Sequence, residues 1–253
     1  MRNAFRPVLA FVIGWWICAA AAQAPSGYQA IYDEPTGVNL GGRPVVAEIA
    51  LFADIESAKR GELRLALVTD VTAFIEETER DLENWIATHQ ERCGNRWGAG
   101  EPFIAFPPGA IRFALYLELE VWNCGWDGKG EPGRLALEAG KVDVTLNPYV
   151  EDGKLQARLG AFSISEQSGL SKYLPLEFVA RQALNGELKK LNENRKFYRA
   201  PRPLYDEGFV YESIGARQGA DGRVVITARY KAKGSVEVLN RLVMKVREDG
   251  LTQ

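Results

Sequence analysis

Histidine is almost absent from this sequence, and the short motifs of the common enzyme classes are missing. The only histidine, His89, falls on the apolar side of an expected helix, where a histidine is more often a hydrogen-bonded core residue than a catalytic base. No Gly-x-Ser-x-Gly, His-Glu-x-x-His, phosphate-binding loop or dinucleotide-binding glycine pattern occurs. The acidic run "EETERDLE" at residues 76–83 lies on the solvated side of the same helix, so it does not predict the paired carboxylates of a glycosidase. We therefore expect no enzyme, no catalytic residues, no metal site and no cofactor.

Basic residues are also not in excess over acidic ones. The chain has 31 Lys and Arg against 33 Asp and Glu, which gives a formal net charge of −2 at pH 7. Proteins that bind nucleic acid through its phosphate backbone need many cationic side chains on one surface. The composition therefore argues against nucleic acid as a partner.

The longest uncharged stretch lies at the N-terminus. Arg2 and Arg6 precede an apolar segment that ends in several alanines at Ala22. This pattern is typical of a secretory signal peptide, here residues 1–22, cleaved near Ala22. The alternative is an N-terminal membrane anchor, because the segment nearly reaches the roughly 17 to 25 residues that span a bilayer. We expect an exported protein located in the periplasm of a Gram-negative bacterium.

Cysteine is scarce, and one of the three cysteines, Cys18, is removed with the signal peptide. The remaining pair, Cys93 and Cys124, is expected to form a disulfide bond, because exported proteins fold in an oxidising compartment. Two free thiols are the alternative. The bond would join the end of a helix to the end of a long strand, and we expect a bulge near Asn123 to bring the two sulfur atoms together.

Composition and alternation suggest the segment boundaries. Residues 23–44 are rich in Gly, Pro and polar side chains without a period, which predicts an irregular leader. Residues 45–253 are expected to form a single domain. Within it, residues 45–61 are ambiguous between strand and helix, with strand favoured, and residues 62–68 alternate as a strand does.

The strongest pattern in the chain is that of a long amphipathic helix. It begins with Thr69 or Asp70 as N-cap and stops at Gly94. About 24 residues at 1.5 Å each predict a rod roughly 36 Å long. Its apolar side comprises Val71, Phe74, Ile75, Thr78, Leu82, Trp85, Ile86, His89 and Cys93.

A second apolar surface comes from residues 111–124, which alternate for longer than the usual strand of about five or six residues. The expected neighbouring strands are residues 103–106, residues 134–146 with a bulge at Gly140, and residues 155–164. Together they predict a meander of long antiparallel strands with one apolar face. On the longest strand this face comprises Ile111, Phe113, Leu115, Leu117, Leu119 and Val121.

Three further elements complete the expected chain. A second amphipathic helix follows Pro175, a hairpin turns near Asp221 and Gly222, and residues 235–248 predict a terminal helix.

This order of elements resembles one module of the TULIP superfamily of tubular lipid-binding proteins, of the size found in its bacterial envelope members. The resemblance covers about residues 62–232 and is carried by "LRLALVTDVTAFIEETERDLENWI", by "LPLEFVARQALNGELKKL" with "FYRAPRPL", and by "GADGRVVITA". It implies an α+β fold in which a long, twisted antiparallel sheet is wrapped around a long amphipathic helix, with a second amphipathic helix packed on it. It also implies that acyl chains or other apolar ligands are held between sheet and helices.

Two hypotheses for the function follow. The first is an exported, non-enzymatic binding protein for a hydrophobic ligand, a lipid or an acyl chain. The second is an envelope scaffold or protein-binding module with the same fold and a packed, ligand-free core, whose partner is a membrane surface or an envelope protein. The sequence does not separate them, because a stripe that lines a tunnel and one that packs a core look alike. The expected ligand-binding residues are Val71, Phe74, Ile75, Leu82, Phe113, Leu115, Leu117 and Leu119.

Overall fold

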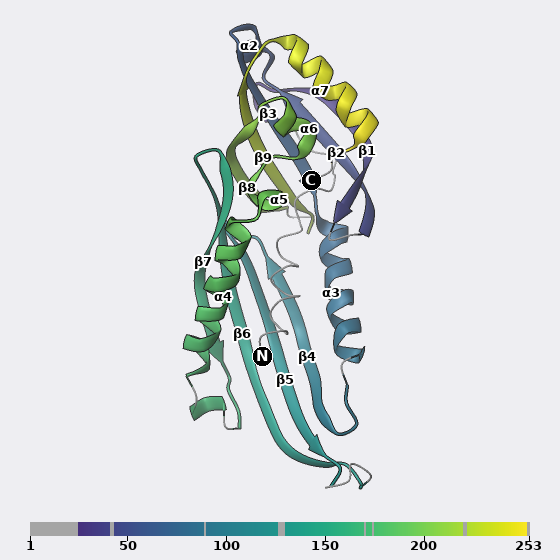
Figure 1. Cartoon of the computed structure of the whole chain (residues 1–253), viewed down its shortest axis with the longest axis vertical. Helices are drawn as coiled ribbons and strands as arrows, with labels where there is room; N and C mark the ends of the chain where they lie inside the picture. The colour runs from purple at the N-terminus through teal and green to yellow at the C-terminus, as the bar shows by residue number, and fades with distance from the viewer. Residues whose placement is uncertain are drawn as a thin grey trace.

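The strands form two antiparallel sheets that follow one another along the long axis of the molecule (Figure 1). The expected signal peptide, residues 1–22, and His89 lie outside the described part of the chain. No helix within that part is long and apolar enough to cross a membrane. The computed structural model describes residues 25–40, 43–88, 90–125, 130–169, 171–173, 175–219 and 222–251.

The first sheet has five strands, in the spatial order β1, β2, β3, β9, β8. Three helices pack around it: α2 (Ile55–Lys59), α6 (Arg202–Asp206) and α7 (Val236–Asp249). On α7, Leu239, Leu242 and Val246 are spaced by three and four residues and are all buried, as one face of an amphipathic helix should be. The strands are β1 (Gln29–Leu40), β2 (Arg43–Ala53), β3 (Glu62–Asp70), β8 (Val210–Gln218) and β9 (Val224–Lys233).

The second sheet is a meander of four long strands, each paired with the next in sequence. A helix lies along each edge of this sheet: α3 (Thr72–Thr88) beside β4, and α4 (Leu176–Asn192) beside β7 (Figure 1). The strands are β4 (Gly94–Ala105), β5 (Ile111–Asn123), β6 (Gly133–Glu151) and β7 (Lys154–Ser165).

The β6–β7 turn joins the two sheets. The backbone N–H of Tyr211, at the start of β8, donates a hydrogen bond to the carbonyl of Gly153 in this turn, at 3.1 Å. Gly153 has a φ of 72°, and a Cβ there would lie 2.9 Å from the Cβ of Val210, so both the backbone conformation and the close approach require glycine. Leu155 and Phe209 are fully buried beside this contact, and one apolar core runs from the first sheet into the second.

Two tyrosines are buried in the core at this junction. Tyr211 and Tyr230 are opposite each other on β8 and β9, with ring centroids 4.8 Å apart. Their hydroxyl groups are hydrogen-bonded to each other, which satisfies two polar groups that water cannot reach. Burial raises the pKa of Tyr211 to about 12 and that of Tyr230 well above its usual value, so both stay neutral at physiological pH.

The expected fold, one long sheet wrapped around a long helix, is wrong. There are two sheets, and α3 has 17 residues, roughly 25 Å at 1.5 Å per residue, rather than the expected length of about 24 residues. The helix ends at Thr88, and β4 begins at Gly94, well before the strand expected at residues 103–106. Because α3 lies along the edge strand β4, the sheet does not enclose it.

Other elements divide into confirmed and corrected predictions. The strand at β3, the long strand β5, the helix α4, the β8–β9 hairpin and the terminal helix α7 are confirmed. The irregular leader expected at residues 23–44 is wrong for residues 29–40, which form β1 by pairing with β2. The expected bulge at Gly140 is also wrong, because Gly140 pairs in regular register with Leu117.

The disulfide bond between Cys93 and Cys124 is confirmed, with the two Cα atoms 5.5 Å apart. Gly94 pairs with Trp122, so the bond closes the open end of the β4–β5 hairpin and does not fasten the end of the helix itself. A register shift lies close to the expected position, between Val121 and Trp122, but the extra residue is Leu135 on the partner strand β6.

Replacing both cysteines with alanine should lower the free energy of unfolding by about 3 to 4 kcal/mol. The reason is that the bond closes a loop with a sequence separation of 31 residues and so restricts the unfolded chain. Urea unfolding of the oxidised wild type and of the double variant measures the difference. The reduced wild type is the control and should match the variant; equal stability of oxidised and reduced protein would contradict the prediction.

An ion-pair cluster around one largely covered carboxylate joins the end of α6 to α7. The side chain of Glu207 is 9% exposed and accepts hydrogen bonds from Lys245 at 2.7 Å and Arg241 at 3.0 Å. The hydrogen bond from Lys245 is the main cause that lowers the pKa of Glu207; the hydrogen bond from Arg241 acts in the same direction, and burial opposes both.

Glu207→Gln should therefore lower the free energy of unfolding by about 1 to 2 kcal/mol at pH 7. Because the folded pKa is depressed, the contribution of the carboxylate is complete above the unfolded pKa of about 4.3 and is lost as pH falls through the folded value. In thermal unfolding, wild type and variant should differ above about pH 4.3 and converge only as the pH falls through the lowered pKa of Glu207. Glu56→Gln, which removes an exposed pair with Lys59, serves as the control and should change stability by no more than about 0.5 kcal/mol.

Candidate functional site

A cavity of about 210 Å³ lies between α3 and β4. On the helix, Leu82 and Ile86 are four residues apart and so share the face that meets the sheet. Both are half-buried, although their place on an amphipathic stripe would suit full burial. The lining residues are Leu82, Glu83, Ile86, Ala87, Ala99 and Pro102.

A small side chain of β4 explains why this space is open. Ala99 offers only a methyl group beneath the helix, whereas its neighbours Gly98 and Gly100 lie on the other face of the strand, beside Glu118 and Tyr116. The pairing of β4 with β5 also shifts between Gly100 and Phe103. Leu82 and Ile86 therefore face a strand that cannot fill the gap, and an apolar cavity results.

The apolar face of β5 continues the cavity lining toward the centre of the sheet. Leu117 pairs with Ala99, and Leu119 pairs with Trp97 on the same face. Phe113, Leu117 and Leu119 remain half-buried, although β5 is an inner strand of its sheet. A ligand in the cavity would have an apolar surface beside it over which to extend.

The expected ligand-binding residues fall into two groups. Leu82 lines the cavity, and Phe113, Leu117 and Leu119 lie half-buried on β5. In contrast, Val71, Ile75 and Leu115 are buried, at 1%, 9% and 3% exposure, and Phe74 packs against the core. Of the cavity walls, Ala99 and Pro102 were not predicted, and Ile86 was predicted only as part of the helical stripe.

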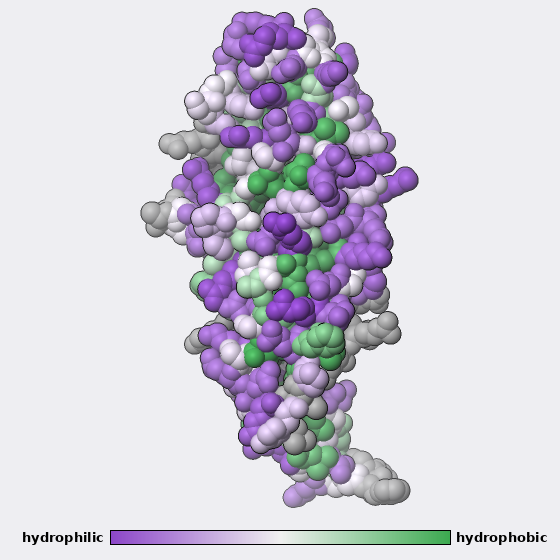
Figure 2. Space-filling view, turned by 90° about the vertical axis from the view of Figure 1, so that its left-hand side faces the viewer, coloured by the Kyte–Doolittle hydropathy of each residue, from purple (hydrophilic) through white to green (hydrophobic). Residues whose placement is uncertain are grey.

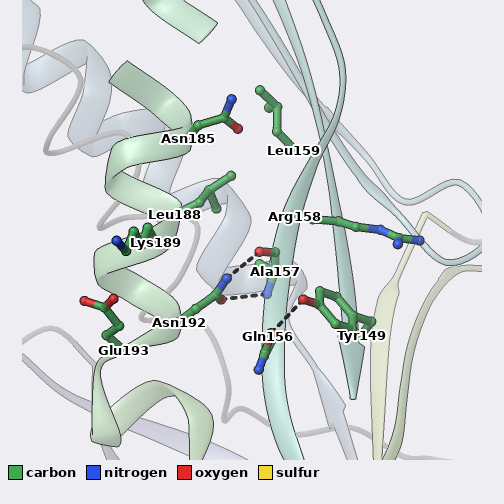
Figure 3. A pocket seen from close by; sticks show the side chains of 10 residues that line it. All are labelled: Tyr149, Gln156, Ala157, Arg158, Leu159, Asn185, Leu188, Lys189, Asn192 and Glu193. Carbon is green, nitrogen blue, oxygen red and sulfur yellow. Dashed lines mark hydrogen bonds between the residues drawn. The ribbon is translucent and has the colours of Figure 1, made fainter. Parts of the chain in front are cut away.

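A second depression, of about 470 Å³, lies between α4 and β7 at the opposite edge of the sheet (Figure 3). The carboxamide of Asn192 holds the strand here: its oxygen accepts from the N–H of Ala157 at 2.9 Å, and its nitrogen donates to the carbonyl of Ala157 at 2.8 Å (Figure 3). Arg181 donates to the carbonyl of Phe162 at 2.8 Å. These side chains satisfy edge backbone groups as a neighbouring strand would.

The described residues contain no group of three or more His, Cys, Asp and Glu side chains able to hold a metal ion. Comparison with known proteins gives no match: no family model fits the sequence, and no curated protein or solved structure is significantly similar to it. The geometry of the two sites is therefore the basis for a functional proposal.

Asn192→Ala should lower the free energy of unfolding by about 1 to 3 kcal/mol, because the N–H and carbonyl of Ala157 lose their partner beneath α4. Asn185→Ala is the matched control on the same helix, since Asn185 lines the same depression but forms no side-chain hydrogen bond with the described residues. Chemical unfolding of both variants checks the difference. Equal destabilisation would show that Asn192 matters only for helix packing.

Proposed function

We propose that this protein is an exported, non-enzymatic binding protein for a hydrophobic ligand, a lipid or an acyl chain, held between α3 and the second sheet. The observation that carries the proposal is the apolar cavity formed by Leu82, Ile86 and Ala99, with the apolar face of β5 beside it. No catalytic group, metal or cofactor enters the proposal.

The size of the cavity limits the ligand. A cavity of about 150 Å³ lined by Leu, Ile and Phe can hold a benzene molecule, whereas pockets for drug-sized molecules have about 300 to 1,000 Å³. The space of about 210 Å³ thus suits one alkyl chain or one ring rather than a bulky molecule. A longer chain would continue over Leu117 and Phe113, which have apolar surface exposed.

Two observations support export. The Cys93–Cys124 disulfide bond is characteristic of proteins that fold outside the reducing cytosol. The pattern of residues 1–22 adds a signal peptide, and we place the mature protein in the periplasm of a Gram-negative bacterium. There it would reach hydrophobic molecules released from either membrane.

A second candidate function is an envelope scaffold or protein-binding module with a packed core. The burial of Val71, Ile75 and Leu115 favours it, because these residues fill the interior and leave no room for a ligand around them. On this alternative the α3–β4 cavity would be unused space.

Lipid mass spectrometry of an organic extract of the purified protein, compared with a denatured control, separates the two. We expect a co-purifying lipid or fatty acid in a near-stoichiometric amount and saturable uptake of a fluorescent fatty acid. Ala99→Phe places a ring in the cavity and should weaken this uptake by about tenfold or more, because even one methylene of lost apolar contact is worth about 0.8 kcal/mol.

Ala161→Phe is the matched control, since Ala161 is an exposed residue of β7, an edge strand on the far side of the same sheet. It should leave the uptake unchanged. An extract without lipid, together with no uptake of the fluorescent fatty acid by the wild type, would favour the protein-binding module with a packed core. Equal losses in both variants would count against the cavity as the binding site.

A further inference from the structure

Glu83 is the one ionisable residue among the six that line the α3–β4 cavity. The four lining residues of α3 fall within an arc of about 140° around the helix, because successive residues turn by about 100°. Leu82 and Ala87 mark the ends of this arc. Glu83 lies between them, so its side chain leaves the helix on the side of the cavity. Because Glu83 is also exposed, its carboxylate lies at the rim of an otherwise apolar space.

The carboxylate of Glu83 has no partner within the protein. It forms no ion pair or hydrogen bond with any residue in the described part of the chain. Arg80, the only basic residue in the sequence of α3, has its Nε 3.4 Å from the carbonyl oxygen of Glu76 instead. Ala99 and Pro102 bring no charge from β4. A ligand in the cavity would therefore meet one negative charge that no cation of the lining compensates.

The helix itself adds to this negative potential in two ways. The sequence of α3 has five acidic residues and one basic residue, a formal charge of −4, whereas the whole chain has only −2. The cavity also lies beside the C-terminal end of α3, since Ile86 and Ala87 belong to the last turn before Thr88. The C-terminal end of a helix dipole is negative and stabilises cations. Both effects attract a cation to the rim and repel an anion.

The helix at the opposite edge of the sheet differs in charge. The sequence of α4 has two acidic and three basic residues, a formal charge of +1. Figure 2, which views the molecule from the α4 side, shows strongly hydrophilic residues between apolar patches there. The concentration of negative charge is therefore specific to α3, the helix that borders the hydrophobic cavity.

We propose that the α3–β4 cavity prefers an amphiphile with a protonated amine head group over one with a carboxylate head group. This inference rests on the proposed function, because it concerns the ligand of the same cavity. The alkyl chain contacts Leu82 and Ile86, and the ammonium group lies at the rim beside Glu83. A carboxylate at the same place is repelled by Glu83 and by the negative end of α3. A fatty acid can still enter the cavity through its chain, but with lower affinity.

Three ligands with the same ten-carbon chain test this preference by calorimetry at pH 7 and low salt: decylamine, decanoate and decan-1-ol. At this pH the amine is protonated and the carboxylic acid is ionised. We expect decylamine to bind about fivefold or more tightly than decanoate, with decan-1-ol between them. The ratio of the two affinities should decrease as the salt concentration rises, because the head groups lie close to the solvent.

Glu83→Gln should reduce this ratio by about threefold or more and leave the affinity for decan-1-ol unchanged, because only the charge at the rim is lost. Glu77→Gln is the matched control. It removes the same charge from an exposed position of α3 that lies about 120° around the helix from Glu83 and outside the cavity lining. It should change the ratio by less than about 1.5-fold. Circular dichroism and thermal unfolding check that both variants are folded.

The outcomes separate the preference from the proposed function. If none of the three ligands binds, both are overturned. Equal affinity for decylamine and decanoate, tighter binding of decanoate, or equal effects of the two substitutions would overturn the preference alone and leave the hydrophobic site in place.

Discussion

The second sheet has two edge strands, β4 and β7, and the outer backbone groups of an edge strand need a cover or a partner. The chain covers both with a helix, but the two contacts differ. On α4, Leu184 and Leu188 are almost fully buried, while Asn192 and Arg181 bind the strand backbone directly. Under α3, β4 presents the small side chain of Ala99, and a cavity remains. The α4 edge is closely packed, whereas the α3 edge leaves the space in which we propose that a hydrophobic ligand binds.

The junction of the sheets explains how so long a molecule keeps one core. The β6–β7 turn reaches the start of β8, where Gly153 contacts Val210 and accepts from Tyr211. Apolar burial continues through Leu155 and Phe209, so the two sheets do not separate into independent layers. The buried pair of Tyr211 and Tyr230 fixes the alignment of β8 and β9, because sliding either strand would leave two hydroxyl groups without a partner.

The sequence predicted those elements whose side chains repeat with a clear period. Residues 111–124 alternate, the helix after Pro175 repeats its leucines, and both elements exist. Only residues 103–105 of β4 were predicted as strand, because Gly94, Gly98 and Gly100 interrupt any alternation in the part before them. β1 was missed because Gly and Pro are typical of loops. The cavity lies where this unrecognised part of β4 presents Ala99 to α3, so Leu82 was predicted as a lining residue but Ala99 was not. Periodicity also fails to separate Val71 from Leu82, because it reports the face of a helix and not the distance to the opposing strand.

The Cys93–Cys124 bond lies where β4 begins and β5 ends, at the lower tip of the molecule in Figure 1. This tip lies beyond the end of α3, so strand pairing there has little help from a helix. Strand ends with few packing contacts open locally at a low free-energy cost, and a covalent bond between the two strands suppresses this fraying. In oxidising surroundings the start of β4 and the end of β5 are therefore held together covalently, whereas in reducing surroundings they can fray.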